Sequence, residues 1–547
     1  MEGISILLII VPFVAASFVL LNRFTTCLLL AKMVSLGAVL LCLFFLLLVF
    51  PAISRGLTFD YPVGGWKEPV GINLYMDGLA WITSLIGMGI ALFCLLYSIA
   101  ENYDYKFYFF FLTLLGGMQG VIFTQDIFNM FVFFEILSIA SYILIAYPGK
   151  ENSIMASFNY LLISSLGIGF YLLGVAILYQ ETGILALRKM PLRLEQMQGN
   201  LFTIQLALLF LVVGIGVKVA FVPFHTWLPG AHAFAPHPVS AVLSGVMIKV
   251  SFLAVWRIIR LFQFVHLQET FLWIGAFTAF LGIIWTLAEN DSKRLLAYSS
   301  VSQMGFIIAS FGAATSVSLV ASFYHLLNHS LFKSLLFLCI GTAIYLTEER
   351  QIGKIKVPIK KTPLLFACFL VGALSISGVP PFNGYVSKNL ISYSLKQHPF
   401  SYFLILLTSA GTVASFIKLS EIFTFKKISE KQNEKTKKIS TTMLVALLFL
   451  SSLCLFTGIF PHFFTAKIFH LILNQKAGSE FIHYSFQEIL RFILTVGLGS
   501  AFYLFIRSQK GEKILKYIKD TKFGISDSLL LFLIGFLLLF ALSMVLK

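Results

Sequence analysis

The chain carries little charge for its length. Only 12% of its 547 residues are Asp, Glu, Lys or Arg, whereas soluble globular proteins carry roughly 25%. Hydrophobic residues make up 58% of the sequence, and the mean hydropathy is +0.91. Apolar runs recur along the chain, each long enough to cross about 30 Å of bilayer hydrocarbon. This composition excludes a soluble globular fold and predicts an all-α polytopic membrane protein.

The sequence also lacks motifs for redox centres and nucleotides. No two cysteines are spaced as Cys-x-x-Cys, and all six lie in apolar runs, which is typical of small packing residues: Cys27, Cys42, Cys94, Cys339, Cys368 and Cys454. The Gly-Ile-Gly at 214–216 lacks the third glycine of a dinucleotide fingerprint. We therefore expect no cofactor and no metal in this chain, so that any electron-transfer chemistry would belong to partner subunits.

We count sixteen apolar runs. The first lacks a basic segment and a small-residue cleavage site, so we expect a retained helix rather than a signal peptide. The predicted spans are 4–21, 28–50, 78–98, 107–124, 127–147, 157–179, 203–226, 239–263, 269–289, 299–314, 317–346, 363–396, 400–424, 441–462, 487–507 and 527–546.

The formal charge of +16 is concentrated in loops, which makes it a topology signal and not a sign of nucleic-acid binding. The loops 347–362, 425–440 and 507–526 follow odd-numbered spans and contain five, six and six Lys/Arg. By the positive-inside rule these loops face the cytoplasm and both termini lie outside. The segment 426–438 is interpreted as a solvated cytoplasmic loop. The loop 507–526 is interpreted as a connector, with a short amphipathic helix on the membrane surface as the alternative.

Several charged residues fall inside the predicted spans. They include Glu135, Lys218, Lys249 and Lys388, and also Lys418 with Glu421 in the next turn. A charge at the bilayer centre costs about 2.5–3.5 kcal/mol on insertion scales, so such residues usually face the bundle interior and mark ion pathways. The alternative for Lys218 and Lys388 is a lysine near a helix end whose ammonium reaches the headgroups.

His325, His329 and Lys333 are spaced one helical turn apart, which places them on one face of a helix. A titratable stripe along a membrane helix is typical of a proton relay. Histidines at this spacing also bind metals, but Lys333 would repel a cation and no carboxylate lies nearby in the sequence. A packed, hydrogen-bonded histidine is the remaining alternative for each ring.

Two spans contain prolines that predict broken helices. Pro223 and Pro229 follow the seventh run, and Pro380 and Pro381 interrupt the twelfth. Paired interrupted helices in corresponding halves are the best sequence indication of a transporter site.

The spacing of the lysines suggests an internal repeat. The separation between Lys218 and Lys388 along the chain is nearly the same as that between Lys249 and Lys418. This coincidence predicts a repeat of helices 4–8 and 9–13. In the alignment that it implies, Glu135 corresponds to Gly305, so the second half has no equivalent acid.

The predicted division of the chain follows from these features. It comprises three N-terminal helices, a first five-helix repeat with broken helix 7, a second repeat with broken helix 12, a basic cytoplasmic loop, helix 14, and two additional C-terminal helices. The ranges are 1–103, 104–265, 266–424, 425–440, 441–462 and 463–547.

Four sequence blocks resemble the antiporter-like subunits shared by Mrp-type Na⁺/H⁺ antiporters, respiratory complex I (NADH-quinone oxidoreductase) and membrane-bound hydrogenases. They are DIFNMFVFFEILSIASY (126–142), the K-x4-P-F-H-T-W-L-P-x-A-H-x-x-A-P stretch from Lys218, HLLNHSLFK (325–333) and SGVPPFNGYVSK (377–388). GGWKEPVGINLYMD (64–77) is most similar to the Mrp D-type and hydrogenase branch. The resemblance implies a 14-helix core with inverted repeats, the first of which would contain Glu135, Lys218 and Lys249.

The resemblance also implies a function. It assigns proton transfer to Glu135, Lys218, Lys249, Lys388 and the region of His325 and His329. We add Lys333 to this set, with His225, Lys418 and Glu421 as secondary candidates. The expected function is cation/proton antiport within a multisubunit membrane complex; the alternative is proton pumping in a complex I-like oxidoreductase or membrane-bound hydrogenase. The expected partners are the other membrane subunits, the lipid bilayer, and H⁺, with Na⁺ as a second candidate ion.

The expected mechanism uses a switchable ion pair. Glu135 and Lys218 at about 4 Å and an effective dielectric near 20 attract by about 4 kcal/mol. Movement of Glu135 would release the Lys218 proton toward Lys249 and then past the histidines to Lys388. Two other classes stay open: a membrane enzyme that uses His225, His232 or His237, and a scaffold whose charges only join helices.

Overall fold

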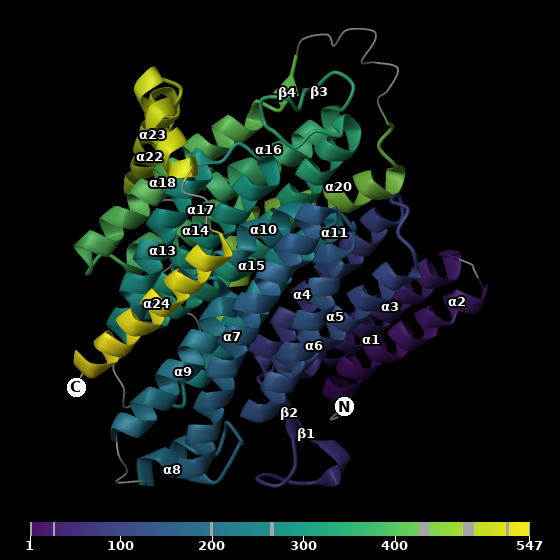
Figure 1. Cartoon of the computed structure of the whole chain (residues 1–547), viewed down its shortest axis with the longest axis vertical. Coiled ribbons are helices and arrows are strands. Elements are labelled where there is room, and N and C mark those ends of the chain that lie inside the picture. Colours follow the sequence, from purple (N-terminus) through teal and green to yellow (C-terminus); the bar gives the residue numbers. More distant parts are fainter. Residues whose placement is uncertain are drawn as a thin grey trace.

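The computed structural model describes residues 3–25, 28–196, 201–262, 267–425, 437–473, 486–520 and 524–545. Most of this part of the chain is helical, and the helices pack side by side (Figure 1). The helices of the first half are α1 (Ile4–Leu20), α2 (Asn22–Thr25), α3 (Leu28–Ile53), α4 (Gly78–Ser98), α5 (Tyr105–Phe123), α6 (Ile127–Ala146), α7 (Glu151–Thr182), α8 (Met190–Gln196), α9 (Leu201–Val219), α10 (Trp227–Phe234), α11 (His237–Val242) and α12 (Ile248–Ile259). A π-helical turn, η2 (Leu243–Met247), joins α11 to α12.

The helices of the second half begin with α13 (Gln268–Ala288), α14 (Ser292–Gly312), α15 (Ser316–Thr347), α16 (Pro363–Ser377), α17 (Asn383–Ser394) and α18 (Pro399–Ser420). The chain continues through α20 (Thr441–Ile459), α21 (Pro461–Leu473), α22 (Phe486–Ile506), α23 (Gln509–Asp520) and α24 (Ile525–Val545). Each of the sixteen predicted spans coincides with helical structure. Among the described residues, fourteen helices are long and apolar enough to cross a membrane, and α16 and α24 contain shorter apolar helices.

Some predicted boundaries are wrong. The predicted sixth and tenth spans begin at 157 and 299, but α7 begins at Glu151 and α14 at Ser292. Polar residues fill these first turns, and helix capping extends each helix beyond its apolar run. Most of the basic segment 426–438 lies outside the described residues. The loop 507–526 contains the helix α23, so the connector interpretation is wrong and the alternative of a short helix is correct.

The connections gather at two ends of the bundle. At one end, β1 (Phe59–Pro62) pairs antiparallel with β2 (Asn73–Met76), near α8 and the N-terminus (Figure 1). At the other, β3 (Val357–Pro358) pairs with β4 (Phe423–Thr424), on the side where α23 lies. Loops that follow odd-numbered spans contact one another, as in the Lys437–Glu348 ion pair. Consecutive membrane spans run in opposite directions, so loops after odd-numbered spans must lie together at one end of the bundle.

The caps of α6 and α14 have similar surroundings. Asp126 caps α6, and Asp291 caps α14. Asp126 forms an isolated β-bridge with Ala186, and Asp291 forms one with Gln351, in each case beyond the following 32-residue helix. The two aspartates and their two bridge partners are separated by the same length of chain. Because each predicted repeat contains an odd number of spans, equivalent helices cross the bundle in opposite directions.

The two helix breaks are closer together along the chain than the two capping aspartates are. Ala220 ends α9 with a positive φ, and Gly378 does the same after α16. The separation of Lys218 and Lys388 along the chain is larger than that of the caps and that of the breaks. Lys218 lies before its break and Lys388 after the other, so the two are not equivalent. Aligned by the caps, Glu135 corresponds to Ser300 instead of Gly305.

Small residues allow the central helices of the second repeat to pack closely. A methyl group on Gly305 of α14 would lie 2.2 Å from the Ala279 nitrogen of α13, and one on Gly275 would lie 2.1 Å from the Ala309 nitrogen. Such close backbone approach is the usual way in which membrane helices gain packing energy. It holds α14, whose side chains contribute to the site described next, rigidly against α13.

The C-terminal helices, whose role the sequence leaves unassigned, extend along the outside of the core. α22 packs on α18, α23 packs near α13, and α24 packs on α9 and α7 (Figure 1). The extension therefore contacts both repeats. Most of α22 is exposed, and its outward side chains are large and apolar.

Candidate functional site

Lys218 lies in the last turn of α9, next to the break. Its side chain is 1% exposed, and its ammonium donates hydrogen bonds to the hydroxyls of Ser138 on α6 and Ser164 on α7. The Nζ atom also lies 5.7 Å from the centre of the Tyr160 ring. The buried charge is thus stabilised by two hydroxyl dipoles and one aromatic face. The alternative of a lysine reaching the headgroups does not apply here.

Glu135 lies one turn before Ser138 on α6 and is partly buried. It is within electrostatic range of Lys218, but among the described residues no carboxylate oxygen lies within 4.0 Å of the Lys218 nitrogen. Its Oε1 atom is buried and makes no hydrogen bond within the described part of the chain. The expected contact ion pair is therefore not formed in this structure, because the two serines hold Lys218 instead.

Lys249 follows the π-helical turn η2. A π-helical turn disrupts the regular hydrogen bonding of an α-helix, and such turns are frequent at functional sites. Here the Lys249 ammonium donates to the Ser244 carbonyl. The hydroxyls of Ser244 and Ser300 lie 2.8 Å apart, which connects this turn to α14 in the second repeat. Lys249 is 1% exposed, like Lys218.

Tyr160 links the surroundings of Lys218 to this turn. Its ring faces Lys218, and its hydroxyl lies 3.8 Å from the sulfur of Met247 in η2. Ser141, one turn after Ser138, contacts the same sulfur at 3.5 Å. The contacts of Tyr160 and Ser141 with the Met247 sulfur therefore lie between Lys218 and Lys249.

The predicted stripe on α15 faces the interior along its whole length. Lys333 donates to the Leu296 carbonyl at 2.8 Å and to the Ser299 hydroxyl. The His325 and His329 rings are parallel, with centres 6.3 Å apart, and both side chains are fully buried. No ring nitrogen of His329 makes a hydrogen bond within the described part of the chain.

His325 connects α15 to the second broken helix. Its Nδ1 lies 2.9 Å from the Ser387 hydroxyl on α17, and its Nε2 lies 3.0 Å from the Gln303 Oε1 on α14. Lys388 follows Ser387 directly; its Nζ atom is 5.0 Å from the centre of the Phe306 ring. That nitrogen is buried and makes no hydrogen bond within the residues described. The site thus ends at the second break.

These side chains form a polar row through the bundle, from one broken helix to the other. Its members are Lys218, Lys249, Lys333, His329, His325 and Lys388. From Lys249 to Lys388 neighbouring members lie within electrostatic range of one another, as do Lys249 with Lys333 and Lys388 with His325. Buried lysines and histidines so close together cannot all carry charge at modest cost, which makes the row suited to passing protons singly.

The secondary candidates lie outside the polar row. Lys418 donates to the carbonyls of Leu287 at 2.8 Å and Glu289 at 2.9 Å, which caps the end of α13. Glu421 pairs with Arg507 and accepts a hydrogen bond from Tyr503 at 2.9 Å. His225 stacks on Trp285 in the first break, with ring centres 4.5 Å apart. These three side chains therefore have structural contacts of their own, away from the members of the row.

A second cluster, absent from the predicted site, leads from the row toward the end that carries β3 and β4. His232 lies within electrostatic range of Lys249 and of Lys293, which donates to the Ala235 carbonyl at 2.6 Å. Lys293 is in turn within range of Glu101, in the loop between α4 and α5. Burial raises the pKa of the Glu101 carboxyl to about 7, although a hydrogen bond from Tyr103 opposes the shift.

Sequence reasoning also missed the serines that hold the lysines. Ser138 lies one turn after Glu135, a spacing that places both on one helical face and was the available signal. The positions of Ser164, Ser299 and Ser387 offered no comparable sign, because serine is common in membrane helices. Within the described residues, no group of three or more His, Cys, Asp or Glu side chains is arranged to hold a metal ion.

Comparisons with known proteins agree with this architecture. A model of the NADH:quinone oxidoreductase/Mrp antiporter transmembrane family matches residues 124–418. The chain is 36% identical to the N subunit of the NADH-quinone oxidoreductase of Desulforudis audaxviator, over 61% of this chain and 68% of the relative. It is 30% identical to the D subunit of the Na⁺/H⁺ antiporter of Bacillus subtilis, over 82% of this chain and 94% of the relative.

A solved structure matches nearly the whole chain. It is the membrane-bound sulfane sulfur reductase, an archaeal respiratory membrane complex, one chain of which superimposes with a TM-score of 0.79 at 26% identity. The match covers 91% of this chain and 99% of that one. Together with the two broken helices and the polar row, these findings show that the chain is a multi-pass membrane protein that belongs to the NADH:quinone oxidoreductase/Mrp antiporter family.

Proposed function

We propose that this chain conducts protons across the membrane as the antiporter-like subunit of an Mrp-type cation/proton antiporter complex. The observation that carries the proposal is the polar row, because buried lysines and histidines at this depth are costly and serve transport when they form a chain. Similarity to the D subunit of a Na⁺/H⁺ antiporter supports the same function.

In the proposed mechanism, Lys218 and Lys388 end the row at the two helix breaks. Freed backbone groups at such breaks line cavities that admit water. A proton on Lys218 passes toward Lys249 when Glu135 moves away, because the carboxylate no longer stabilises the ammonium. It then passes through the surroundings of Lys333, His329 and His325 to Lys388. Buried ring nitrogens with no protein partner, as on His329, are sites where bridging water would complete the path.

The cluster of His232, Lys293 and Glu101 supports entry of protons from the end that carries β3 and β4. We place this end in the cytoplasm and both termini outside, in a bacterial or archaeal cell membrane, because the loops after odd-numbered spans hold most of the basic residues. Labelling of single cysteines tests this orientation. The variant Lys356→Cys should react with a membrane-impermeant thiol reagent only in inside-out vesicles. Reaction in intact cells would place the end that carries β3 and β4 outside the cell.

A second host complex is favoured by one observation. The matched chain of the sulfane sulfur reductase, a respiratory membrane complex, covers 91% of this sequence. We therefore keep, as the alternative, a proton-pumping subunit of a complex I-like oxidoreductase or membrane-bound hydrogenase. In either complex, this chain would move protons and its partners would supply the driving reaction.

The experiment begins with purification of the native complex and identification of its subunits by mass spectrometry. The complex is then reconstituted into liposomes, and proton flux is followed with a pH-sensitive dye under a sodium gradient. Flux that depends on sodium supports the antiporter. Flux that requires a reducing substrate and redox subunits supports the alternative, and purification of the chain without partners would contradict both.

Two matched variants test the polar row itself. Lys249→Met and Lys418→Met each remove a largely buried lysine that donates to a main-chain carbonyl. We expect Lys249→Met to abolish proton flux and Lys418→Met to retain it, because only Lys249 lies in the row. Equal loss in two normally assembled complexes would contradict the proposed path, and would favour a scaffold role for these charges.

A further inference from the structure

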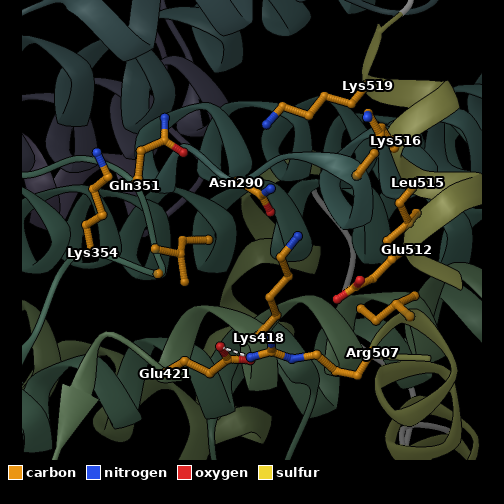
Figure 2. A pocket seen from close by; sticks show the side chains of 14 residues that line it. Asn290, Gln351, Lys354, Lys418, Glu421, Arg507, Glu512, Leu515, Lys516 and Lys519 are labelled. Atoms are coloured by element: carbon orange, nitrogen blue, oxygen red, sulfur yellow. Dashed lines mark hydrogen bonds and ion pairs between the residues drawn. The ribbon is translucent and has the colours of Figure 1, made fainter. Parts of the chain in front are cut away.

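A cavity of about 640 Å³ lies between the C-terminal extension and the core (Figure 2). Its walls come from α23, the ends of α13, α18 and α22, and the loop after α15. The lining residues are Ala288, Asn290, Gln351, Ile352, Gly353, Lys354, Lys418, Glu421, Ile506, Arg507, Glu512, Leu515, Lys516 and Lys519. All of these elements meet at the bundle end that carries β3 and β4, where the spans leave the apolar region.

The lining is strongly basic. It holds five lysines and arginines against two glutamates. Lys418 is occupied by the carbonyls of α13, and Arg507 pairs with Glu421. The side-chain ammonium groups of Lys354, Lys516 and Lys519 make no hydrogen bond or ion pair within the described part of the chain. Glu421 is already paired with Arg507, which leaves Glu512 as the other negative charge in the lining.

The three unpaired lysines lie on opposite walls. Figure 2 shows Lys354 beside Gln351 on one side and Lys516 and Lys519 on α23 across the cavity. Helix C-termini favour nearby cations, and Lys418 already donates to a carbonyl at the end of α13. The charge of the other three therefore exceeds what the helix ends require. It fits an anion that sits between the walls and accepts hydrogen bonds from both.

The surroundings of the cavity indicate that this anion belongs to a lipid. Leu504 and Phe505 immediately precede the lining residue Ile506 and are 69% and 50% exposed. On α23, Ile514 and Tyr517 are 51% and 78% exposed. Large exposed apolar side chains at the end of a membrane span lie at the boundary of the acyl chains, where a basic pocket between helices suits a lipid headgroup.

From this arrangement we infer that the cavity binds the phosphate group of an anionic phospholipid. Lys354 approaches the headgroup from the core, and Lys516 and Lys519 approach it from α23. The acyl chains lie along the exposed side of α22. The lipid thereby joins the C-terminal extension to the loop after α15.

The test uses the purified native complex and native mass spectrometry. Bound phospholipid is counted during titration with phosphatidylglycerol, with phosphatidylcholine as the zwitterionic comparison and inorganic phosphate as the soluble anion. The variant Lys354→Gln/Lys516→Gln/Lys519→Gln removes the three cavity charges. The control, Lys356→Gln/Lys510→Gln/Lys513→Gln, removes three exposed charges from the same loop and helix, none of which lines the cavity.

We expect the wild-type complex to retain phosphatidylglycerol in preference to phosphatidylcholine. Each lysine near the membrane surface contributes about fivefold in affinity, so the cavity variant should bind on the order of 100-fold more weakly. The control should bind close to wild type. Equal weakening in both variants would overturn the inference, because it would show general surface attraction.

Two further outcomes, both measured on the wild type, decide the inference even if the variants assemble poorly. Equal retention of phosphatidylcholine would show that the negative headgroup is not recognised. Displacement of phosphatidylglycerol by inorganic phosphate at equal concentration would assign the cavity to a soluble anion. Either result would reject a phospholipid site.

Discussion

Replacement of Glu135 by glutamine tests the electrostatic coupling at the start of the polar row. The substitution removes the negative charge and nearly preserves the shape of the side chain. Since Oε1 of Glu135 makes no hydrogen bond within the described residues, little stability should be lost. We expect a complex that assembles normally and no longer transports protons at a useful rate.

The size of the effect follows from the geometry. Glu135 interacts electrostatically with Lys218, but the charged atoms are farther apart than 4.0 Å. At an effective dielectric near 20, the attraction is about 4 kcal/mol at 4 Å and about 2 kcal/mol at twice that distance. If this energy drives proton release, its loss slows transport by roughly 30-fold to almost 1,000-fold.

The assay is dye-monitored proton flux in liposomes that contain the native complex. Glu421→Gln is the matched control, because Glu421 is also a carboxylate in a membrane helix region but pairs with Arg507 outside the row. Glu135→Asp keeps the charge and should recover part of the flux. Subunit composition is checked for every variant by mass spectrometry.

The reasoning would be refuted if Glu135→Gln transported at a third or more of the wild-type rate. It would also fail if Glu421→Gln lost flux to the same extent, since the effect would then reflect loss of any buried carboxylate. Loss of subunits in Glu135→Gln alone would favour the scaffold alternative.

Three further predictions concern the other parts of the site. Ser387→Ala removes the hydroxyl next to Nδ1 of His325, a bond worth about 1 kcal/mol, and should lower proton flux about fivefold in the same liposome assay without loss of assembly. Burial raises the pKa of Glu101 from 4.5 to about 7, so the folded state binds the Glu101 proton more tightly than the unfolded state does. The contribution of Glu101 to the free energy of unfolding therefore falls as the pH rises from about 4.5 to 7. Glu101→Gln should therefore flatten the dependence of Tm on pH between about 4.5 and 7; an unchanged slope would contradict the assignment. A methyl group on Gly384 would lie 1.8 Å from the Ser375 carbonyl oxygen, so Gly384→Ala should lower Tm measurably, and an unchanged Tm would show that the second break is not packed as described.

Much of the fold could be predicted because a bilayer imposes a simple rule on sequence. A helix that crosses about 30 Å of hydrocarbon needs a long apolar run, and each predicted run coincides with a helix. The helix breaks were also predictable, since Pro223 and Pro381 cannot continue an α-helix. The boundaries at 157 and 299 failed because polar capping turns carry no hydrophobic signal.

The members of the polar row could be named from the sequence for a related reason. Charged side chains are rare in spans, so Lys218, Lys249 and Lys333 stood out against an apolar background. The spacing of His325, His329 and Lys333 placed them on one face of a helix, and this face is buried in the structure. The roles of these residues in proton transfer remain predictions until flux is measured.

The alignment of the repeats needed the structure. The matching separations of two lysine pairs suggested an equivalence, but the caps and bridges are closer together along the chain than those lysines, and the breaks are closer still. Loops of different length between the helices of the two predicted repeats would produce such differences. Only backbone geometry, and not the position of a few charges, reveals such shifts.

By itself, the sequence determined the membrane class, the apolar runs that form helices, the two breaks and the identity of the members of the polar row. The tertiary structure decided what each of them contacts. Lys218 is held by Ser138 and Ser164, whereas Lys418 caps α13 outside the row. The reason is physical: hydrophobicity and helical periodicity are local properties of the chain, but the partner of a buried ammonium depends on which helices, distant in sequence, pack against it.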